Sequence, residues 1–131
     1  MLFTKCIFHK KSPADGIRIS VMSRHTLNDG ALPDSRITSS VFDEHIPQLG
    51  PAPKLIGAYY RHFINWNDFE AQYRSQIRIE PCKSIVEKLA KCALTEDITL
   101  LCVEDKPDHC HRRILAEECK IYIPELVIEH H

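Results

Sequence analysis

A chain of 131 residues with 44% hydrophobic and 27% charged residues has an ordinary globular composition, and its length predicts one domain over residues 1–131. Its formal net charge of −1 argues against a broad nucleic-acid-binding surface, which would carry an excess of Lys and Arg, but still allows a local basic pocket. The apolar runs are only a few residues long, which excludes a membrane span and a secretory signal, so we expect a cytoplasmic protein.

The first part of the chain predicts two strands and a long loop. Residues 3–8 alternate and contain Phe, Cys and Ile, and residues 17–23 alternate in the same way, so both stretches predict strands. Residues 24–35 are rich in Asn, Asp, Gly and Pro and predict a loop, whose turn at residues 28–30 would shape the rim of a crevice. Residues 37–46 form a short element whose type the pattern leaves open.

Three helices are predicted in the middle of the chain. Residues 54–65 place apolar side chains at helical spacing, and residues 68–78 form a second amphipathic helix with Asn67 as its N-cap. Pro81 suits the first position of a third helix over residues 81–94. The stripe of this third helix that would face the core is made of Ile85, Leu89 and Cys92.

The last part of the chain predicts strand, helix and strand. Residues 97–104 are a continuous apolar run with β-branched residues, typical of a strand buried on both faces. Asp108 is the natural N-cap of a helix over residues 109–121, and residues 125–130 predict a final strand. The buried edge of this helix is expected at Ile114, Leu115, Glu118 and Cys119. Strands separated by helices predict an α/β fold: one three-layer domain with a mainly parallel sheet flanked by helices.

The cysteines and histidines form no familiar metal or redox motif. No Cys-x-x-Cys pair is present, which argues against a zinc ribbon and a thioredoxin-type centre. In a chain without a secretory signal we expect the six thiols to be reduced, and most of them to pack as small core residues. His130 and His131 end the chain and are as compatible with a tag remnant as with a natural end.

The start of the last helix combines several groups that can carry chemistry. In parallel sheets ligands bind at the carboxyl ends of the strands, beside helix N-termini. With Asp108 as the N-cap, Cys110, His111 and Arg112 would stand in the first helical turn, where unpaired backbone N–H groups favour an anion or a thiolate. We therefore expect the pKa of the Cys110 thiol to be lowered.

Four interpretations of this segment compete. In the first, Cys110 is a nucleophile or redox thiol, activated by the helix end and by an adjacent histidine. A phosphatase loop is excluded, because its Cys-x5-Arg spacing would need arginine where Ala116 stands. In the second, Arg112 and Arg113 bind a phosphate or carboxylate together with the helix amides, and the thiol takes no covalent part.

The third interpretation is a metal site and the fourth is purely structural. A metal site would draw on Cys102, Glu104, His109, Cys110 and His111. Because their spacing matches no usual zinc motif and at most two or three of them converge, we assign no metal or cofactor and keep zinc as an alternative. In the structural interpretation Cys110 packs in the core and the arginines pair with nearby acids, so that nothing binds.

Residues near two strand ends and in the middle helices could complete a site. Glu104 ends a buried strand, where an acid is unusual unless it pairs with a cation or serves as a base. Arg24 and His25 follow the second strand and could project into the same crevice, although Arg24 could equally be a surface cation. The aromatic residues of the middle helices could stack a base, but at helical spacing such residues more often belong to a core. They are Tyr59, Tyr60 and Trp66, with His62 beside them.

Three stretches resemble the domain-of-unknown-function 488 (DUF488) family. The stretch TLLCVEDKPDHCHRRILAEE resembles the family's C-terminal signature: a strand ending Leu-Leu-Cys-x-Glu, a short acidic turn, and Cys-His-Arg on the next helix. DGIRISVMSRHTLNDG is similar to an earlier strand that carries an arginine near its end, and INWNDFEAQYRSQI to a Trp-x-x-Phe-x-x-x-Tyr helix of one branch. Two features depart from the family: the Gly-His-Ser type opening is absent, and Met22 stands where members often have an aspartate.

The resemblance implies an α/β fold and a pocket, but no settled activity. The implied lining residues are Arg24, Cys102, Glu104, Cys110, His111 and Arg112. Our leading hypothesis is an enzyme acting on a phosphate-bearing ligand, either a nucleotide or a nucleic-acid end. Arg112 and Arg24 would bind its phosphate with help from His25 and Cys102. Glu104 or His111 would serve as acid or base, and Cys110 as nucleophile if the mechanism is covalent. The alternative is a non-catalytic anion- or nucleic-acid-binding module that uses Arg24 and Arg112.

Overall fold

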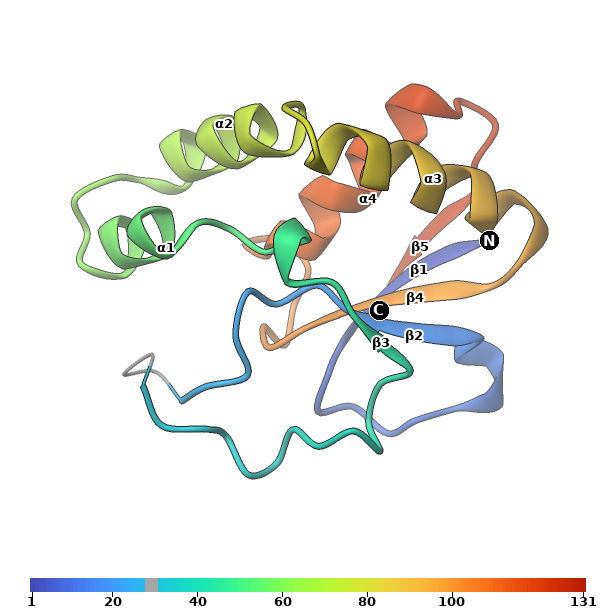
Figure 1. Ribbon diagram of the computed structural model, residues 1–131, viewed down its shortest axis with the longest axis horizontal. Coiled ribbons are helices and arrows are strands. Elements are labelled where there is room, and N and C mark those ends of the chain that lie inside the picture. The colour runs from blue at the N-terminus through green and yellow to red at the C-terminus, as the bar shows by residue number, and fades with distance from the viewer. Residues whose placement is uncertain (28–30) are drawn as a thin grey trace.

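Five parallel strands form one sheet in a computed structural model that describes residues 1–27 and 31–131 (Figure 1). The strand order is β3-β2-β4-β1-β5, so the fourth strand along the chain lies at the centre. The strands are β1 (Leu2–Cys6), β2 (Ile17–Ser20), β3 (Glu44–His45), β4 (Ile98–Cys102) and β5 (Ile128–His130). The helices are α1 (Pro53–Tyr60), α2 (Trp66–Ile77), α3 (Cys82–Thr95) and α4 (His111–Tyr122), with short 3-10 helices η1 (Pro13–Asp15) and η2 (Pro47–Leu49).

The molecule has three layers. Figure 1 shows the four α-helices gathered over one face of the sheet, where α4 contacts β1 and β4 while α2 and α3 pack against α4. Loops cover the other face and enclose a second, smaller cluster of buried side chains. Its buried members are Ile7, Met22, Ile37, Leu101, Cys102 and Cys110. The predicted α/β fold, with its parallel sheet and three layers, is confirmed.

The central strand is buried on both faces, as its sequence predicts. All five residues of β4 are buried. Leu100 joins the core beneath the helices, whereas its neighbour Leu101 joins the cluster beneath the loops. A strand that packs against both layers needs apolar residues at successive positions, which explains the absence of alternation in this stretch.

The strands are shorter than predicted. β1 ends at Cys6 and β2 at Ser20, two and three residues before the predicted ends. The next residues stay buried and still bond to the central strand: Ile7 N donates to Cys102 O at 2.8 Å, and Val21 N to Leu101 O at 3.1 Å. The apolar pattern therefore outlasts the regular strand. β4 likewise ends before the predicted residue 104, and within residues 37–46 only the two residues of β3 form a strand.

Two helix starts differ from the predictions because other residues provide the caps. The N-cap of α2 is Asn65, not Asn67: its side-chain oxygen accepts the backbone N–H of Asp68 at 2.8 Å, and Asp68 completes the capping box. The N-cap of α4 is Cys110, not Asp108, because a turn in which Cys110 N donates to Pro107 O precedes the helix. The first turn of α4 therefore begins two residues later than predicted.

The buried faces of α3 and α4 follow from their spacing. α3 begins after Pro81, which stands just outside the helix rather than at its first position. Its deepest residues are Val86, Leu89, Ala90 and Ala93, whereas the predicted Ile85 and Cys92 are only half-buried. On α4 the predicted edge is confirmed, since Ile114, Leu115, Glu118 and Cys119 are all buried. α1 ends at Tyr60, five residues before the predicted end.

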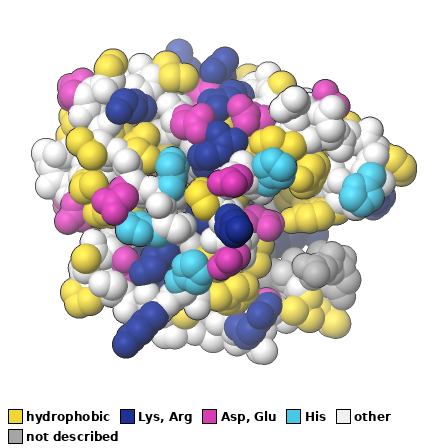
Figure 2. Space-filling model, turned by 180° about the vertical axis from the view of Figure 1, so that it is seen from behind, with side chains coloured by type: hydrophobic (Ala, Val, Ile, Leu, Met, Phe, Trp, Pro, Cys, Tyr) yellow, Lys and Arg dark blue, Asp and Glu magenta, His cyan; other side chains and the backbone are white. Residues whose placement is uncertain are grey.

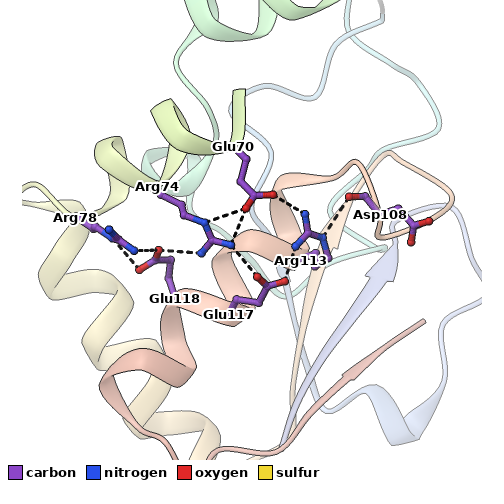
Figure 3. Close-up of polar contacts among 7 residues, drawn as sticks. All are labelled: Glu70, Arg74, Arg78, Asp108, Arg113, Glu117 and Glu118. Atoms are coloured by element: carbon purple, nitrogen blue, oxygen red, sulfur yellow. Dashed lines mark hydrogen bonds and ion pairs between the residues drawn. The ribbon is translucent and has the colours of Figure 1, made fainter. Parts of the chain in front are cut away.

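An ion network joins α2 to α4 (Figure 3). Arg74 donates to Glu117 at 2.8 Å and to Glu118 at 3.0 Å, and Arg78 donates to Glu118 at 2.7 Å. Glu118 is 1% exposed, so its carboxylate depends on these two arginines. The six members are Glu70, Arg74, Arg78, Arg113, Glu117 and Glu118.

The strand connections place a crevice between β2 and β4. These two strands are neighbours, but the chain leaves β2 toward β3 on one side and leaves β4, through α4, toward β5 on the other. Adjacent parallel strands whose connections diverge leave a crevice at their carboxyl ends, the usual ligand position in such sheets. Among the described residues, no helix combines the length and the apolar character that a membrane crossing requires.

Candidate functional site

A pocket of about 420 Å³ lies in the crevice between β2 and β4. The segment after β2 forms one side, the end of β4 and the start of α4 form the floor, and α1 and α2 form the opposite side. Five of the predicted site residues line it: Arg24, Cys102, Glu104, Cys110 and His111. His25 and Arg112 are not among the lining residues. The predicted turn at residues 28–30 lies outside the described residues.

Close backbone packing fixes the two sides of this pocket against each other. Gly50 precedes α1 and lies against Ser23, which lines the pocket. A Cβ atom at position 50 would stand 2.3 Å from the backbone nitrogen of Ser23, closer than any non-bonded contact allows. Only glycine therefore lets these two segments meet.

Aromatic rings form one wall of the pocket. The Trp66 ring stacks on His109, with centroids 4.7 Å apart and planes 18° from parallel. Trp66 also stacks on Phe69 at 5.0 Å, and the ring of Tyr59 meets both. The sequence favoured a core role for such residues. In the structure Tyr59 and Trp66 pack against the core and also line the pocket, whereas Tyr60 lines the pocket and is largely exposed.

A carboxylate and a phenol meet on the pocket surface. The Tyr60 hydroxyl donates to the Glu104 carboxylate at 2.8 Å. Although the Tyr60 ring is largely exposed, desolvation of its hydroxyl raises the pKa of Tyr60, and the hydrogen bond to Glu104 raises it further. Tyr60 therefore remains a hydrogen-bond donor at neutral pH and fixes one oxygen of Glu104.

Two thiols and an imidazole form the pocket floor. Cys102, Cys110 and His111 are 3%, 2% and 7% exposed. Cys102 Sγ lies 3.5 Å from His111 Nδ1, while His111 Nε2 lies 2.7 Å from the carbonyl oxygen of Val21. The ring of Tyr73 meets His111 edge-on at 5.4 Å. The imidazole is thus held from three sides.

The expected reactivity of Cys110 is corrected by its burial. The sequence predicts a lowered pKa, but burial raises the pKa of Cys110 well above its ordinary value, and the adjacent Cys102 thiol raises it further. His111 lowers it, without offsetting the burial. Moreover, Cys110 is the N-cap of α4, but its side chain makes no capping hydrogen bond. The helix end therefore does not activate this thiol.

Thiol labelling measures this difference directly. In native, reduced, chelator-treated protein at pH 7, we expect iodoacetamide to modify the half-buried Cys92 at least about tenfold faster than Cys110, because alkylation needs an accessible thiolate. Peptide mass spectrometry after quenching resolves the two sites. Faster labelling of Cys110 than of Cys92 would contradict the buried, protonated state described above.

Arg112 is buried and does not line the pocket. Its side chain is fully buried, and it donates to the backbone carbonyl oxygens of Glu104, Asp105 and His131. The cation therefore holds the loop that carries Glu104. The Nε of Arg112 is buried without a hydrogen-bond partner among the described residues. Arg113, the second arginine, pairs with Glu70 and Glu117 in the ion network.

Of the two predicted site residues that follow β2, one lines the pocket and the other does not. Arg24 is exposed and lines the pocket. The His25 ring instead stacks on His45 with centroids 4.0 Å apart, and its Nε2 lies 2.7 Å from Ser20 Oγ. Burial lowers the pKa of His25, and His45 lowers it further.

Sequence reasoning missed Arg61 and the stacking of Trp66 on His109. Arg61 follows the last residue of α1, one position after Tyr60, and lines the pocket. The sequence could have suggested Arg61 as a site residue, because it directly follows Tyr60 at the end of α1. Nothing in the sequence connects Trp66 with His109, which stand 43 positions apart and meet only through the packing of α2 beside α4.

Charge on the visible rear surface is mixed. Seen from behind, acidic and basic side chains lie interspersed, with histidines among them (Figure 2). The described residues that this view shows thus carry charges of both signs, unlike the single-sign basic field that long nucleic acids require.

Comparison with known proteins identifies a matching family. A family model described as the active DUF488-N3 subclade (DUF488-N3a) matches residues 2–120. No curated protein and no solved structure matches the chain.

Proposed function

Since the chain belongs to the DUF488 family, we propose that its pocket is the active site of an enzyme acting on a phosphate-bearing ligand, a nucleotide or a nucleic-acid end. The matching subclade is described as active, which favours catalysis over binding alone. The volume of about 420 Å³ falls within the roughly 300–1,000 Å³ typical of small-ligand pockets.

The observation that carries this proposal is the combination of three groups in one pocket. The aromatic wall of Tyr59, Trp66 and His109 gives the pocket ring surface against which a base can pack, and a stacking contact is worth about 1–3 kcal/mol. Arg24 and Arg61 supply guanidinium groups that suit a phosphate. Glu104 supplies a carboxylate for proton transfer. These three groups match a ligand that carries a base and a phosphate: the rings would contact the base, the arginines the phosphate, and Glu104 the reacting bond between them.

Each polar residue then has a separate task. Arg24 and Arg61 bind the phosphate, and Glu104, oriented by Tyr60, accepts or donates the proton. Arg112 acts as a positioning residue, because it donates a hydrogen bond to the backbone carbonyl of Glu104. Burial makes Cys110 a poor nucleophile, and His111 Nε2 is already engaged by Val21, so the acid–base task falls to Glu104.

Thermal shift tests the binding part of this proposal. With a nucleoside 5′-monophosphate at about ten times its Kd, we expect the melting temperature to rise by about 5 °C. The matching nucleoside and inorganic phosphate should each give less than half of this rise, since each engages one part of the pocket. Trp66→Ala and Arg24→Ala should each remove most of the rise. Lys91→Ala, an equal charge change on the exposed face of α3, should preserve it.

Product analysis distinguishes the enzyme from the binding module. Incubation with nucleoside monophosphates and a 5′-phosphorylated oligonucleotide, followed by mass spectrometry, should reveal a product. Glu104→Gln should lower its rate of formation by about 10²–10⁴-fold while the ligand-induced melting shift remains. A protein that binds these ligands and converts none of them would be a non-catalytic module. If no phosphate-bearing ligand raises the melting temperature, both alternatives are wrong.

A further inference from the structure

Three potential metal ligands converge on the pocket floor. One donor atom from each of Cys102, Cys110 and His111 lies within 4.8 Å of the other two. Cys102 ends β4, while Cys110 and His111 start α4, so two rigid elements hold the group. All three residues line the pocket, and the site they would form therefore has one side open to a ligand.

The orientation of His111 is that of a metal ligand. The Val21 carbonyl oxygen can only accept, so His111 Nε2 carries the proton, and the lone pair of Nδ1 faces Cys102 Sγ. Metal-binding histidines are commonly fixed in this way, with the second ring nitrogen donating to a backbone carbonyl. Here the partner comes from the segment after β2, on the opposite side of the crevice.

The separation of two of the three donor atoms suits a tetrahedral ion. Sulfur at about 2.3 Å and nitrogen at about 2.0–2.1 Å from zinc, separated by the tetrahedral angle, lie roughly 3.5 Å apart. Cys102 Sγ and His111 Nδ1 are separated by 3.5 Å. Little movement of either side chain would therefore be needed to bind the ion.

We propose that Cys102, Cys110 and His111 bind a zinc ion whose fourth coordination position opens into the pocket. Thiolate and imidazole ligands together favour zinc over magnesium or calcium, which prefer oxygen. Two cysteines and one histidine with an open fourth position are a known catalytic zinc arrangement, in which water or a substrate atom completes the coordination.

Zinc binding also changes the protonation state of the two cysteines on the pocket floor. Without a cation, burial and the neighbouring thiol keep Cys110 protonated. A coordinated thiol loses its proton, so binding forms two sulfur–zinc bonds and one nitrogen–zinc bond and releases the two thiol protons to solvent.

A second group of possible ligands provides a matched control. Cys6, His9 and Asp105 also bring their donor atoms within 4.8 Å, but His9 and Asp105 are exposed and hydrogen-bonded to each other at 2.8 Å. A thiol-to-hydroxyl change at Cys6 therefore removes a cysteine from a different three-residue group.

Metal titration of reduced, chelator-treated protein tests the proposal. Against a competing chromophoric chelator, we expect one tightly bound Zn²⁺ per chain. Co²⁺ should give a thiolate-to-cobalt charge-transfer band and intense visible bands of tetrahedral geometry. Cys110→Ser and Cys102→Ser should each weaken Zn²⁺ binding about 100-fold or more, whereas Cys6→Ser and Cys92→Ser should leave it within about twofold.

Several outcomes would overturn the zinc site. These are a wild-type protein that binds no Zn²⁺ in competition, a Co²⁺ spectrum without thiolate charge transfer, and binding lost in Cys6→Ser but kept in Cys110→Ser. A Cys102–Cys110 disulfide formed in place of metal binding would do so too. The wild-type stoichiometry and spectrum decide the question even if a variant fails to fold. Because no nucleotide is present, this result is independent of the proposed function.

Discussion

Arg112→Met should lower the free energy of unfolding by about 3 kcal/mol, although the residue touches no pocket surface. Its cation donates three hydrogen bonds to backbone carbonyls, each worth about 1.5 kcal/mol when the donor is charged. The substitution also removes the Nε that is buried without a partner, which restores about 1 to 2 kcal/mol of the free energy of unfolding. The lost hydrogen bonds therefore outweigh the gain from removing Nε, and the net change is destabilising. Because methionine has a similar volume, the loss of stability reflects the hydrogen bonds rather than a cavity.

Urea unfolding measures this loss, and Lys120→Met on the exposed side of α4 provides the control. Lys120 is an exposed cation near the end of the same helix, so its replacement by methionine should change stability by less than about 1 kcal/mol. Arg112→Met should also abolish the nucleotide-induced melting shift, because the loop carrying Glu104 loses its support. Wild-type stability in Arg112→Met, or an equal loss in Lys120→Met, would refute the positioning role.

Glu118→Ala should destabilise the fold by about 3 kcal/mol. The carboxylate is 1% exposed and accepts from Arg74 and Arg78, so its removal leaves two cations without their shared acid. Arg78 can regain water because about half of its side chain is exposed, which keeps the loss at the low end for a broken buried pair. A domain of this size has a stability of about 5–15 kcal/mol, so the change is readily measured by urea unfolding.

Glu70→Gln is the control within the same network, and pH distinguishes the two variants. Arg113 lowers the pKa of Glu70 below its ordinary 4.5 despite partial burial, and Arg74 lowers it further. Because the folded-state pKa is depressed, Glu70 contributes its full stabilisation above about pH 4.5 and loses it as the pH falls through the folded-state value. The deficit of Glu70→Gln should therefore vanish on acidification, while the part of the Glu118→Ala deficit that comes from the removed buried side-chain volume persists. A pH-independent deficit in Glu70→Gln would contradict its ionic origin.

Local signals in the sequence predict the sheet but not the helix starts. The uninterrupted apolar residues of β4 predict a strand buried on both faces, and all five of its residues are buried in the structure. Asp108 and Asn67 have good capping side chains, but capping depends on where the preceding loop ends. Asn65 and Cys110 hold the cap positions because the turns before them stop there. That stopping point is set by tertiary packing.

The periodicity of α4 did indicate the position of Arg112. This residue stands three, four and seven positions before Leu115, Ala116 and Cys119, all of which are fully buried, so it belongs to the inner face of the helix. Arginine's affinity for phosphate suggested a ligand instead. The sequence could not reveal that backbone carbonyls, which no residue type encodes, are its partners. The aromatic wall is equally non-local, because Trp66 and His109 meet only through helix packing.

The position of β4 also determines when the pocket can form during folding. β1 and β2 flank β4 and do not pair with each other, so among the strands described before β4 the only pairing is the two-residue pairing of β2 with β3. The sheet closes when a segment some eighty residues downstream inserts between two strands made long before it. Such non-local closure is slow, and until it happens the strand edges stay open to other chains. The carboxyl ends of β2 and β4, which border the pocket, are thus brought together in this late step. We therefore expect the protein to become able to bind its ligand only when the sheet closes.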